Sequence, residues 1–150
     1  MSDEAASTGR IVVGVDGSEQ SKAALRWAVA QAELTGGVVE AVFAWQNPYY
    51  WYGWSPPEEE PFDFEEQART GLARAIVEAI GLDQPVRVTP RVVEGIPARV
   101  LLDAAQGADL LIVGNRGHGG FTEALLGSVG QHCVQHAPCP VVVIRGAEVR

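Results

Sequence analysis

The sequence is poor in several residues and patterns that mark specialised proteins. It has two cysteines among 150 residues, which is too few for a small domain held together by disulfide bonds. It has no apolar run of about 18 residues, the length that a transmembrane helix needs. Aromatic residues make up 7% of the chain, whereas 47% of the residues are hydrophobic and 20% are charged. This balance excludes an intrinsically disordered chain, so we expect one soluble globular domain.

Positive charge is also scarce. Eleven lysines and arginines stand against nineteen acidic residues, which gives a formal net charge of −8, and Lys22 is the single lysine. A surface for nucleic acid or for an anionic membrane needs a clustered positive excess, so we expect neither partner. The first eight residues do not resemble a secretion signal, which predicts a cytoplasmic protein with reduced thiols. Cys133 and Cys139 match no zinc or redox spacing, and we expect them to be packing residues.

Short runs rich in β-branched residues alternate along the chain with segments of helical apolar spacing. The predicted strands are 10–16, 38–45, 86–93, 109–114 and 140–145, and the predicted helices start near Ser18, Glu65, Pro97 and Ser128. Glycines at positions 36, 81 and 107 end the first three helices. Pro97 suits a first helical position because its missing N–H is not needed there. Strict alternation predicts an α/β fold, with a mainly parallel five-stranded sheet and helices on both faces.

The composition of each segment also suggests its place. We expect 109–114, the most apolar strand, to be central, and 86–93, with three polar residues on one face, to lie at an edge or to have one more solvated face. Trp27 and Trp45 are predicted to pack in the core. Residues 1–9 and 147–150 are predicted tails around a domain at 10–146. This domain holds a Pro-rich insertion at 46–64, whose seven aromatic residues form either a lid over a ligand or a local or subunit contact.

Two of the predicted strands end in loops of unusual composition. The first strand is followed by Asp16-Gly17-Ser18, and the fourth by a glycine-rich loop that begins at Gly114. In parallel sheets, ligands bind beyond the carboxyl ends of the strands, where the strand order reverses. If these two strands are neighbours, both loops open into one crevice. Asp16 is then either a ligand-binding residue or only a turn former, because Asp-Gly is a frequent turn pair.

The loop after Gly114 favours an anion. Its glycines let the backbone approach a ligand closely, and Gly127-Ser128 opens a helix whose free N–H groups and positive dipole end attract phosphate. Ser128 and Gln131 also fit a capping box, so Ser128 is a phosphate contact, a cap or both. The loop has no Walker lysine, no third glycine of GxGxxG and no GxSxG elbow, so standard phosphate-cleaving and acyl-transfer sites are unsupported.

Gly114-x2-Gly117-x9-Gly127-Ser128 resembles the G-2x-G-9x-G-[S/T] nucleotide motif of the universal stress protein family. The strand and turn at 11–18 and the segments at 94–97 and 136–143 are similar to other landmarks of that family. The resemblance covers about 10–145 and points to the single-domain, ATP-binding type. It implies a Rossmann-like sheet of order 3-2-1-4-5, of the adenine nucleotide alpha hydrolase-like kind, with nucleotide between the ends of the first and fourth strands.

The same resemblance implies a set of site residues. Asp16 would lie near the ribose or near a phosphate-bound Mg²⁺ or Mn²⁺. Val15 and Ala44 would present backbone groups to the adenine. The other nucleotide-binding residues that the resemblance implies are Val113, Gly114, Arg116, Gly117, Gly127, Ser128 and Val129. The departures of this sequence from common forms of the family are Phe43, Asn115 and His118, which bear on affinity rather than on class.

Three functions stay open on this reasoning. The first is an ATP-binding stress-response or signalling module with slow or no hydrolysis. The second is a weak ATPase or nucleotide-dependent transferase that uses Asp16 and His118, although no lysine clamp or positioned base supports catalysis. The third is a dimeric scaffold that binds no nucleotide and acts through its aromatic insertion.

The last strand bears on assembly. In a monomer, Val141–Ile144 would be an exposed apolar edge. Members of the resembled family commonly pair this strand across a two-fold axis, so we expect a homodimer. His132 and His136 lie one helical turn apart, but the pattern offers no third ligand, and we expect no metal ion there.

Overall fold

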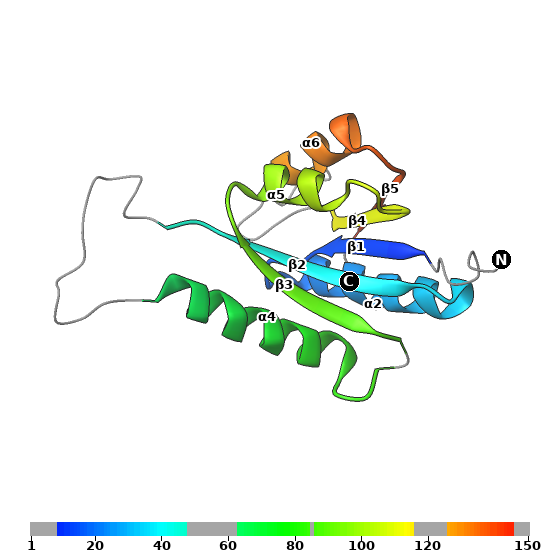
Figure 1. The fold of residues 1–150 in the computed structure, drawn as a ribbon, viewed down its shortest axis with the longest axis horizontal. Helices are drawn as coiled ribbons and strands as arrows, with labels where there is room; N and C mark the ends of the chain where they lie inside the picture. Colours follow the sequence, from blue (N-terminus) through cyan, green and yellow to red (C-terminus); the bar gives the residue numbers. More distant parts are fainter. Residues whose placement is uncertain (1–8, 48–62, 85, 116–125, 146–150) are drawn as a thin grey trace, which may run out of the picture.

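The computed structural model describes residues 9–47, 63–84, 86–115 and 126–145, where five strands alternate with four helices as predicted (Figure 1). The strands are β1 (Arg10–Gly14), β2 (Val38–Trp45), β3 (Val88–Glu94), β4 (Leu110–Gly114) and β5 (Val141–Ile144). The helices are α2 (Glu19–Thr35), α4 (Phe64–Ile80), α5 (Pro97–Ala104) and α6 (Ser128–His136). No helix in these ranges combines the length and the apolar character that crossing a bilayer requires. The two predicted tails, except Gly9, lie outside the described residues.

All neighbouring strands run parallel, in the order β3-β2-β1-β4-β5. The first two connections pass through α2 and α4 on one face, and the next two pass through α5 and α6 on the other face (Figure 1). The predicted fold class and strand order are therefore confirmed. The edge position expected for 86–93 is confirmed too. The middle strand, however, is β1; β4 is internal but one place from the edge.

The strand β1 shows why the strands are apolar throughout. Val12 packs with α5 and α6, whereas Ile11 and Val13 pack with α2 and α4. This division follows because successive side chains of a strand point to opposite faces of the sheet. Helices cover both faces, so neither set of side chains meets water and the strand is an unbroken apolar run.

The outer edge of β3 is blocked against further pairing. Hydrogen bonds from the Val39 N–H to Arg87 O and from the Gly95 N–H to Trp45 O place the odd-numbered residues of β3 against β2. Pro90 therefore has its nitrogen on the open edge. A proline there removes no bond of the existing sheet, but it offers no N–H to a further strand.

The outer edge of β5 is open to pairing. The Leu111 N–H donates to Pro140 O and the Asn115 N–H donates to Ile144 O, so the even-numbered residues of this segment bond to β4. Val141 and Val143 consequently turn their backbone groups outward. Proline and charged side chains are the usual features that prevent edge pairing. The four residues of β5 include neither.

The prediction that Trp27 packs in the core is wrong. Trp27 is 38% exposed, and Leu34 on the same side of α2 is 82% exposed. The buried side of α2 includes Leu25 and Ala28, and Trp27 lies about 100° around the helix from Ala28. Trp45, the second tryptophan predicted to be a core residue, is half-buried at the end of β2.

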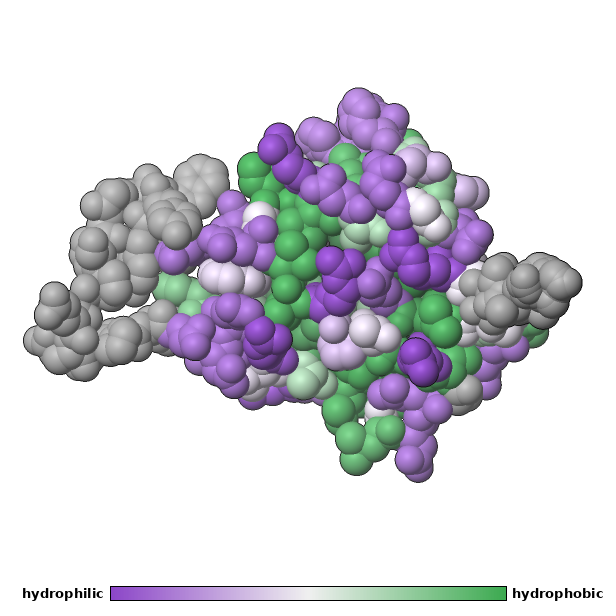
Figure 2. Space-filling model, viewed as in Figure 1, coloured by the Kyte–Doolittle hydropathy of each residue, from purple (hydrophilic) through white to green (hydrophobic). Residues whose placement is uncertain are grey.

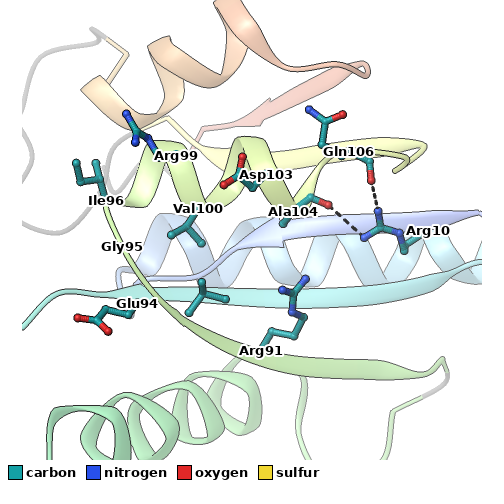
Figure 3. Close-up of a pocket in the computed structure, with 11 residues that line it drawn as sticks. Arg10, Arg91, Glu94, Gly95, Ile96, Arg99, Val100, Asp103, Ala104 and Gln106 are labelled. Carbon is teal, nitrogen blue, oxygen red and sulfur yellow. Dashed lines mark hydrogen bonds between the residues drawn. The ribbon is translucent and has the colours of Figure 1, made fainter.

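Arg10 joins three elements on the α5 side of the sheet. Its guanidinium donates to Glu40 Oε1 at 2.7 Å, to Ala104 O at 3.2 Å and to Gln106 O at 2.7 Å. The second oxygen of Glu40 accepts a bond from Arg91 at 3.1 Å. Arg10 and Arg91 line a cavity of about 310 Å³ beside α5 (Figure 3), next to an apolar band over the crossing of β2 and β3 (Figure 2). None of the predicted site residues that the structure describes lines this cavity.

We expect Arg10→Met to lower the free energy of unfolding by about 2 kcal/mol, because it removes three guanidinium bonds and leaves Glu40 short of a partner. Arg91→Met makes the same change of charge but removes only one hydrogen bond, and the Arg91 side chain is more exposed than that of Arg10. We expect a loss of under about 1 kcal/mol for that control. Urea unfolding measures both values, and equal losses would contradict the bracing role of Arg10.

Candidate functional site

β1 and β4 are neighbours, but the chain leaves them toward opposite faces of the sheet. α2 follows β1 on one face and α6 follows β4 on the other, which opens the crevice where sheets of this type bind ligands. The two connections are in contact at this point. A Cβ atom on Gly114 would lie 2.9 Å from the Cβ and 3.1 Å from the backbone carbon of Gln20 in α2.

The turn after β1 is held by hydrogen bonds among Asp16, Ser18 and Ser21. Asp16 Oδ1 accepts from the Ser18 N–H at 2.9 Å, and the Asp16 N–H donates to Ser21 Oγ at 3.2 Å. Ser21 is 4% exposed, and its hydroxyl donates to Ser18 O at 3.0 Å. Asp16 therefore does form the turn, and it stays exposed at the end of β1. Ser21 is the residue that braces this turn, a role that its three-residue spacing from Ser18 only hints at.

Asn115 joins both ends of the loop that follows β4. Its backbone oxygen accepts from the Gly127 N–H at 2.7 Å, and its own N–H donates to Ile144 O at 2.8 Å. The end of β4, the start of α6 and the end of β5 are thus tied at one residue. Gly127 is the N-cap of α6 and Ser128 is the first residue of that helix.

The capping box predicted for Ser128 and Gln131 does not form. The Gln131 N–H donates to Gly127 O at 2.9 Å, which makes Gly127 the cap residue. A capping box needs a side chain at the cap position, and glycine has none. Ser128 is exposed inside the first turn, and the cap residue Gly127 makes no side-chain bond to this helix. The helix start therefore keeps N–H groups of the kind that attract an anion.

The side chain of Asn115 carries an unpaired acceptor. Its Oδ1 atom is buried and has no hydrogen-bond partner in the part of the chain that the structure describes. A buried carbonyl without a partner costs about 1–3 kcal/mol, so an atom of this kind calls for a donor that the described residues do not supply. A ligand that offers a hydroxyl or amino group at this place would fit the residues present.

The remaining described residues of the predicted site belong partly to the core. Val15 and Val113 are each 3% exposed, so only their backbone groups could face a ligand. The Val15 N–H already donates to Val42 O at 2.9 Å. Ala44 and Val129 are partly buried against the core on the α5–α6 side. Val15 and Ala44 lie at the carboxyl ends of the neighbouring strands β1 and β2.

Some predicted residues cannot be placed. Arg116, Gly117 and His118 lie outside the described residues, as does most of the aromatic insertion. Phe64, the last aromatic residue of that insertion, is the first residue of α4.

The described ranges contain no group of three or more His, Cys, Asp or Glu residues that could hold a metal ion. The rings of His132 and His136 lie 6.2 Å apart between centroids on α6. Cys133 is buried and Cys139 is half-buried, and neither forms a disulfide bond. Burial raises the pKa of the Cys133 thiol to about 11, and it also raises the pKa of Cys139. Both thiols stay protonated near neutral pH and pack against the core.

Comparison with known proteins identifies the family. A model of the universal stress protein family matches residues 8–145, a range that includes every described strand and helix. The chain belongs to the universal stress protein family. The resemblance seen in the glycine motif therefore extends over nearly the whole sequence.

This universal stress protein is 36% identical over 140 residues to a universal stress protein of Thermus aquaticus, covering 90% of this chain and 97% of that protein. It is 35% identical over 144 residues to one of Mycolicibacterium smegmatis, covering 91% of this chain but 48% of that protein. The chain thus spans about half the length of the mycobacterial relative and nearly all of the Thermus relative.

Solved structures share the fold. A universal stress protein from Lactobacillus plantarum superposes with a TM-score of 0.68 at 26% identity, covering 92% of this chain and 98% of that one. A universal stress protein in complex with cAMP gives a TM-score of 0.60 at 24% identity, covering 93% and 98%. One from Archaeoglobus fulgidus in complex with dAMP gives 0.63 at 21% identity, covering 91% and 97%.

Proposed function

We propose that this chain binds ATP, with Mg²⁺ or Mn²⁺ on the phosphates, as a stress-response or signalling module with slow or no hydrolysis. The observation that carries the proposal is the start of α6, where Ser128 is exposed and the cap residue, Gly127, has no side chain to cap the helix. This helix start follows β4, the neighbour of β1, and Asp16 lies in the turn after β1. Support also comes from two proteins of the same fold, which were solved in complex with cAMP and dAMP.

The proposal gives each residue of the predicted site a role. Free N–H groups at the start of α6 and the Ser128 hydroxyl donate to phosphate oxygens. Gly114, Arg116 and Gly117 complete the phosphate and ribose contacts. A divalent cation supplies positive charge in a chain of net charge −8 with one lysine, and Asp16 is the carboxylate that would hold it at this edge.

The adenine end of the site uses backbone groups. Val15 and Ala44, at the ends of β1 and β2, face the base through main-chain atoms, because Val15 itself is buried. Val113 and Val129 flank the ribose from β4 and from the first turn of α6. A base held in this way is read by hydrogen bonds that do not depend on side-chain identity.

The primary experiment identifies what the protein carries and what stabilises it. The purified chain is denatured in nucleotide-free buffer and the released small molecules are identified by mass spectrometry. About one adenine nucleotide per chain supports the proposal. An empty protein whose melting temperature also ignores millimolar Mg-ATP contradicts it, because a ligand above its dissociation constant must stabilise the folded state. Phosphate release that disappears in Asp16→Asn would favour the ATPase alternative instead.

Ser128→Ala is expected to weaken Mg-ATP binding about tenfold to 100-fold, the value of one hydrogen bond to a charged group. The stability of the nucleotide-free protein should change by less than about 0.5 kcal/mol, because Ser128 is exposed and caps nothing. Gln131→Ala, one turn along α6, is the matched control and should leave the affinity unchanged. Calorimetric titration and urea unfolding measure the two quantities. A loss of stability without a loss of affinity would contradict the role of Ser128.

We further propose that two copies pair through β5. The open edge of β5, with outward backbone groups at Val141 and Val143, contrasts with the edge that Pro90 blocks on β3. Pairing two β5 strands across a two-fold axis satisfies these groups in both copies. We also propose a cytoplasmic location, which suits the free thiols of Cys133 and Cys139.

A further inference from the structure

Asn115 has a side-chain acceptor that no described part of the fold uses. Both of its backbone groups are engaged, the oxygen with Gly127 and the N–H with Ile144. The residue is therefore fixed between the end of β4 and the start of α6. Its Oδ1 is nonetheless buried and unpaired among the described residues, although native proteins pair nearly all buried acceptors.

The chemistry of a carboxamide oxygen restricts the donor that can satisfy it. Oδ1 accepts hydrogen bonds and donates none, so it disfavours the oxygens of an ionised phosphate. An adenine nucleotide offers two kinds of donor, which are the ribose hydroxyls and the exocyclic amino group. The phosphates belong at the start of α6, directly beside the backbone bond between Gly127 and Asn115, and the ribose is the donor-bearing group next to the phosphates.

We propose that Asn115 makes this site selective for ribonucleotides, because its Oδ1 accepts a hydrogen bond from a ribose hydroxyl of the bound nucleotide. The inference rests on the proposed nucleotide binding and adds its sugar specificity. One protein of this fold was solved in complex with dAMP, which has a deoxyribose. The fold alone thus does not demand the hydroxyl, and discrimination has to come from residues of the individual chain.

The proposal predicts opposite effects of Asn115→Ala on the free and the bound protein. Removing an unpaired acceptor leaves the stability of the nucleotide-free protein unchanged or raises it. Removing the acceptor from the complex weakens Mg-ATP binding by about fivefold to tenfold. If Asn115 instead served the fold through an interior water, the variant would lose stability and keep its affinity.

The experiment titrates wild type and Asn115→Ala with Mg-ATP, 2′-deoxy-ATP and 3′-deoxy-ATP. For the wild type, we expect one of the two deoxy analogues to bind about fivefold to tenfold more weakly than ATP. The variant should bind that analogue and ATP equally, because the same bond cannot be lost twice. Gln84→Ala, a carboxamide that donates to Gly81 O at the far end of α4, is the control and should behave as the wild type.

The outcomes separate the two proposals. A wild type that binds no ATP overturns both. A wild type that binds ATP and both deoxy analogues equally overturns the role of Asn115 alone, and this arm needs no variant to fold. A variant that keeps the full preference for ATP over the deoxy analogue also overturns it, since the discrimination would then come from another residue.

Discussion

Gly114→Ala is expected to lower the free energy of unfolding by about 3 kcal/mol, the upper end of what overpacking costs in a core. The added Cβ would lie 2.9 Å from Gln20 Cβ and 3.1–3.2 Å from the backbone carbon and oxygen of the same residue. Backbone atoms inside α2 cannot turn away as the end of a flexible side chain can. The close contact between the added Cβ and Gln20 can therefore be relieved only if α2 and β4 move apart. This movement also widens the crevice between them.

Gly71→Ala is the matched control for this change. Gly71 lies inside α4, and a Cβ there would meet Phe43 Cζ at 3.9 Å, an ordinary contact. Alanine is the better helix former by about 0.5–1 kcal/mol, so the control should gain stability. Urea unfolding of the two variants is expected to give shifts of opposite sign. A Gly114 variant as stable as the wild type would contradict the close contact between β4 and α2.

Val143→Pro is expected to convert a dimer into a monomer and to raise the dimer dissociation constant by at least about 100-fold. Val143 turns its N–H to the open edge of β5, so proline there removes a bond between copies but no bond to β4. The N–H of Val142, in contrast, belongs to the ladder with β4. Sedimentation of wild type and variant at micromolar concentration measures the change.

Val92→Pro provides the same substitution on the other edge. Val92 is an even-numbered residue of β3, so its N–H also points away from the sheet. Both variants keep the bonds of their own sheet, and only the change in β5 should affect assembly. A wild type that sediments as a single 16.0 kDa chain would contradict pairing through β5, as would a Val92 variant that dissociates in the same way.

The fold was largely predictable because its signals are local. Strands buried on both faces are continuous apolar runs, and Gly36 and Gly81 end helices at the positions that the sequence predicts. Pro97 begins α5 as expected. The exposure of Trp27 was not predictable in the same way. Apolar residues lie around more of α2 than the elements packed against this helix cover.

For the candidate site, the neighbouring positions of the two strand ends were predictable and the local contacts were not. The glycine motif and the turn at Asp16 indicated which strand ends matter, and the order of β1 and β4 agrees. The cap of α6 was assigned to Ser128 rather than Gly127, because a serine followed by a glutamine three residues later is also a valid cap pattern. The contact of Gly114 with Gln20 and the unpaired Asn115 Oδ1 depend on tertiary packing, which spacing in the sequence does not reveal.

The proline in β3 limits how far sheets of this protein can grow. A β-sheet with two accepting edges can add copies without end, as fibrils do. Here one edge ends growth at Pro90, and the other is used up once two copies meet. If two copies pair through β5 as proposed, growth stops at two copies, and the chain can keep an apolar edge strand without seeding a filament.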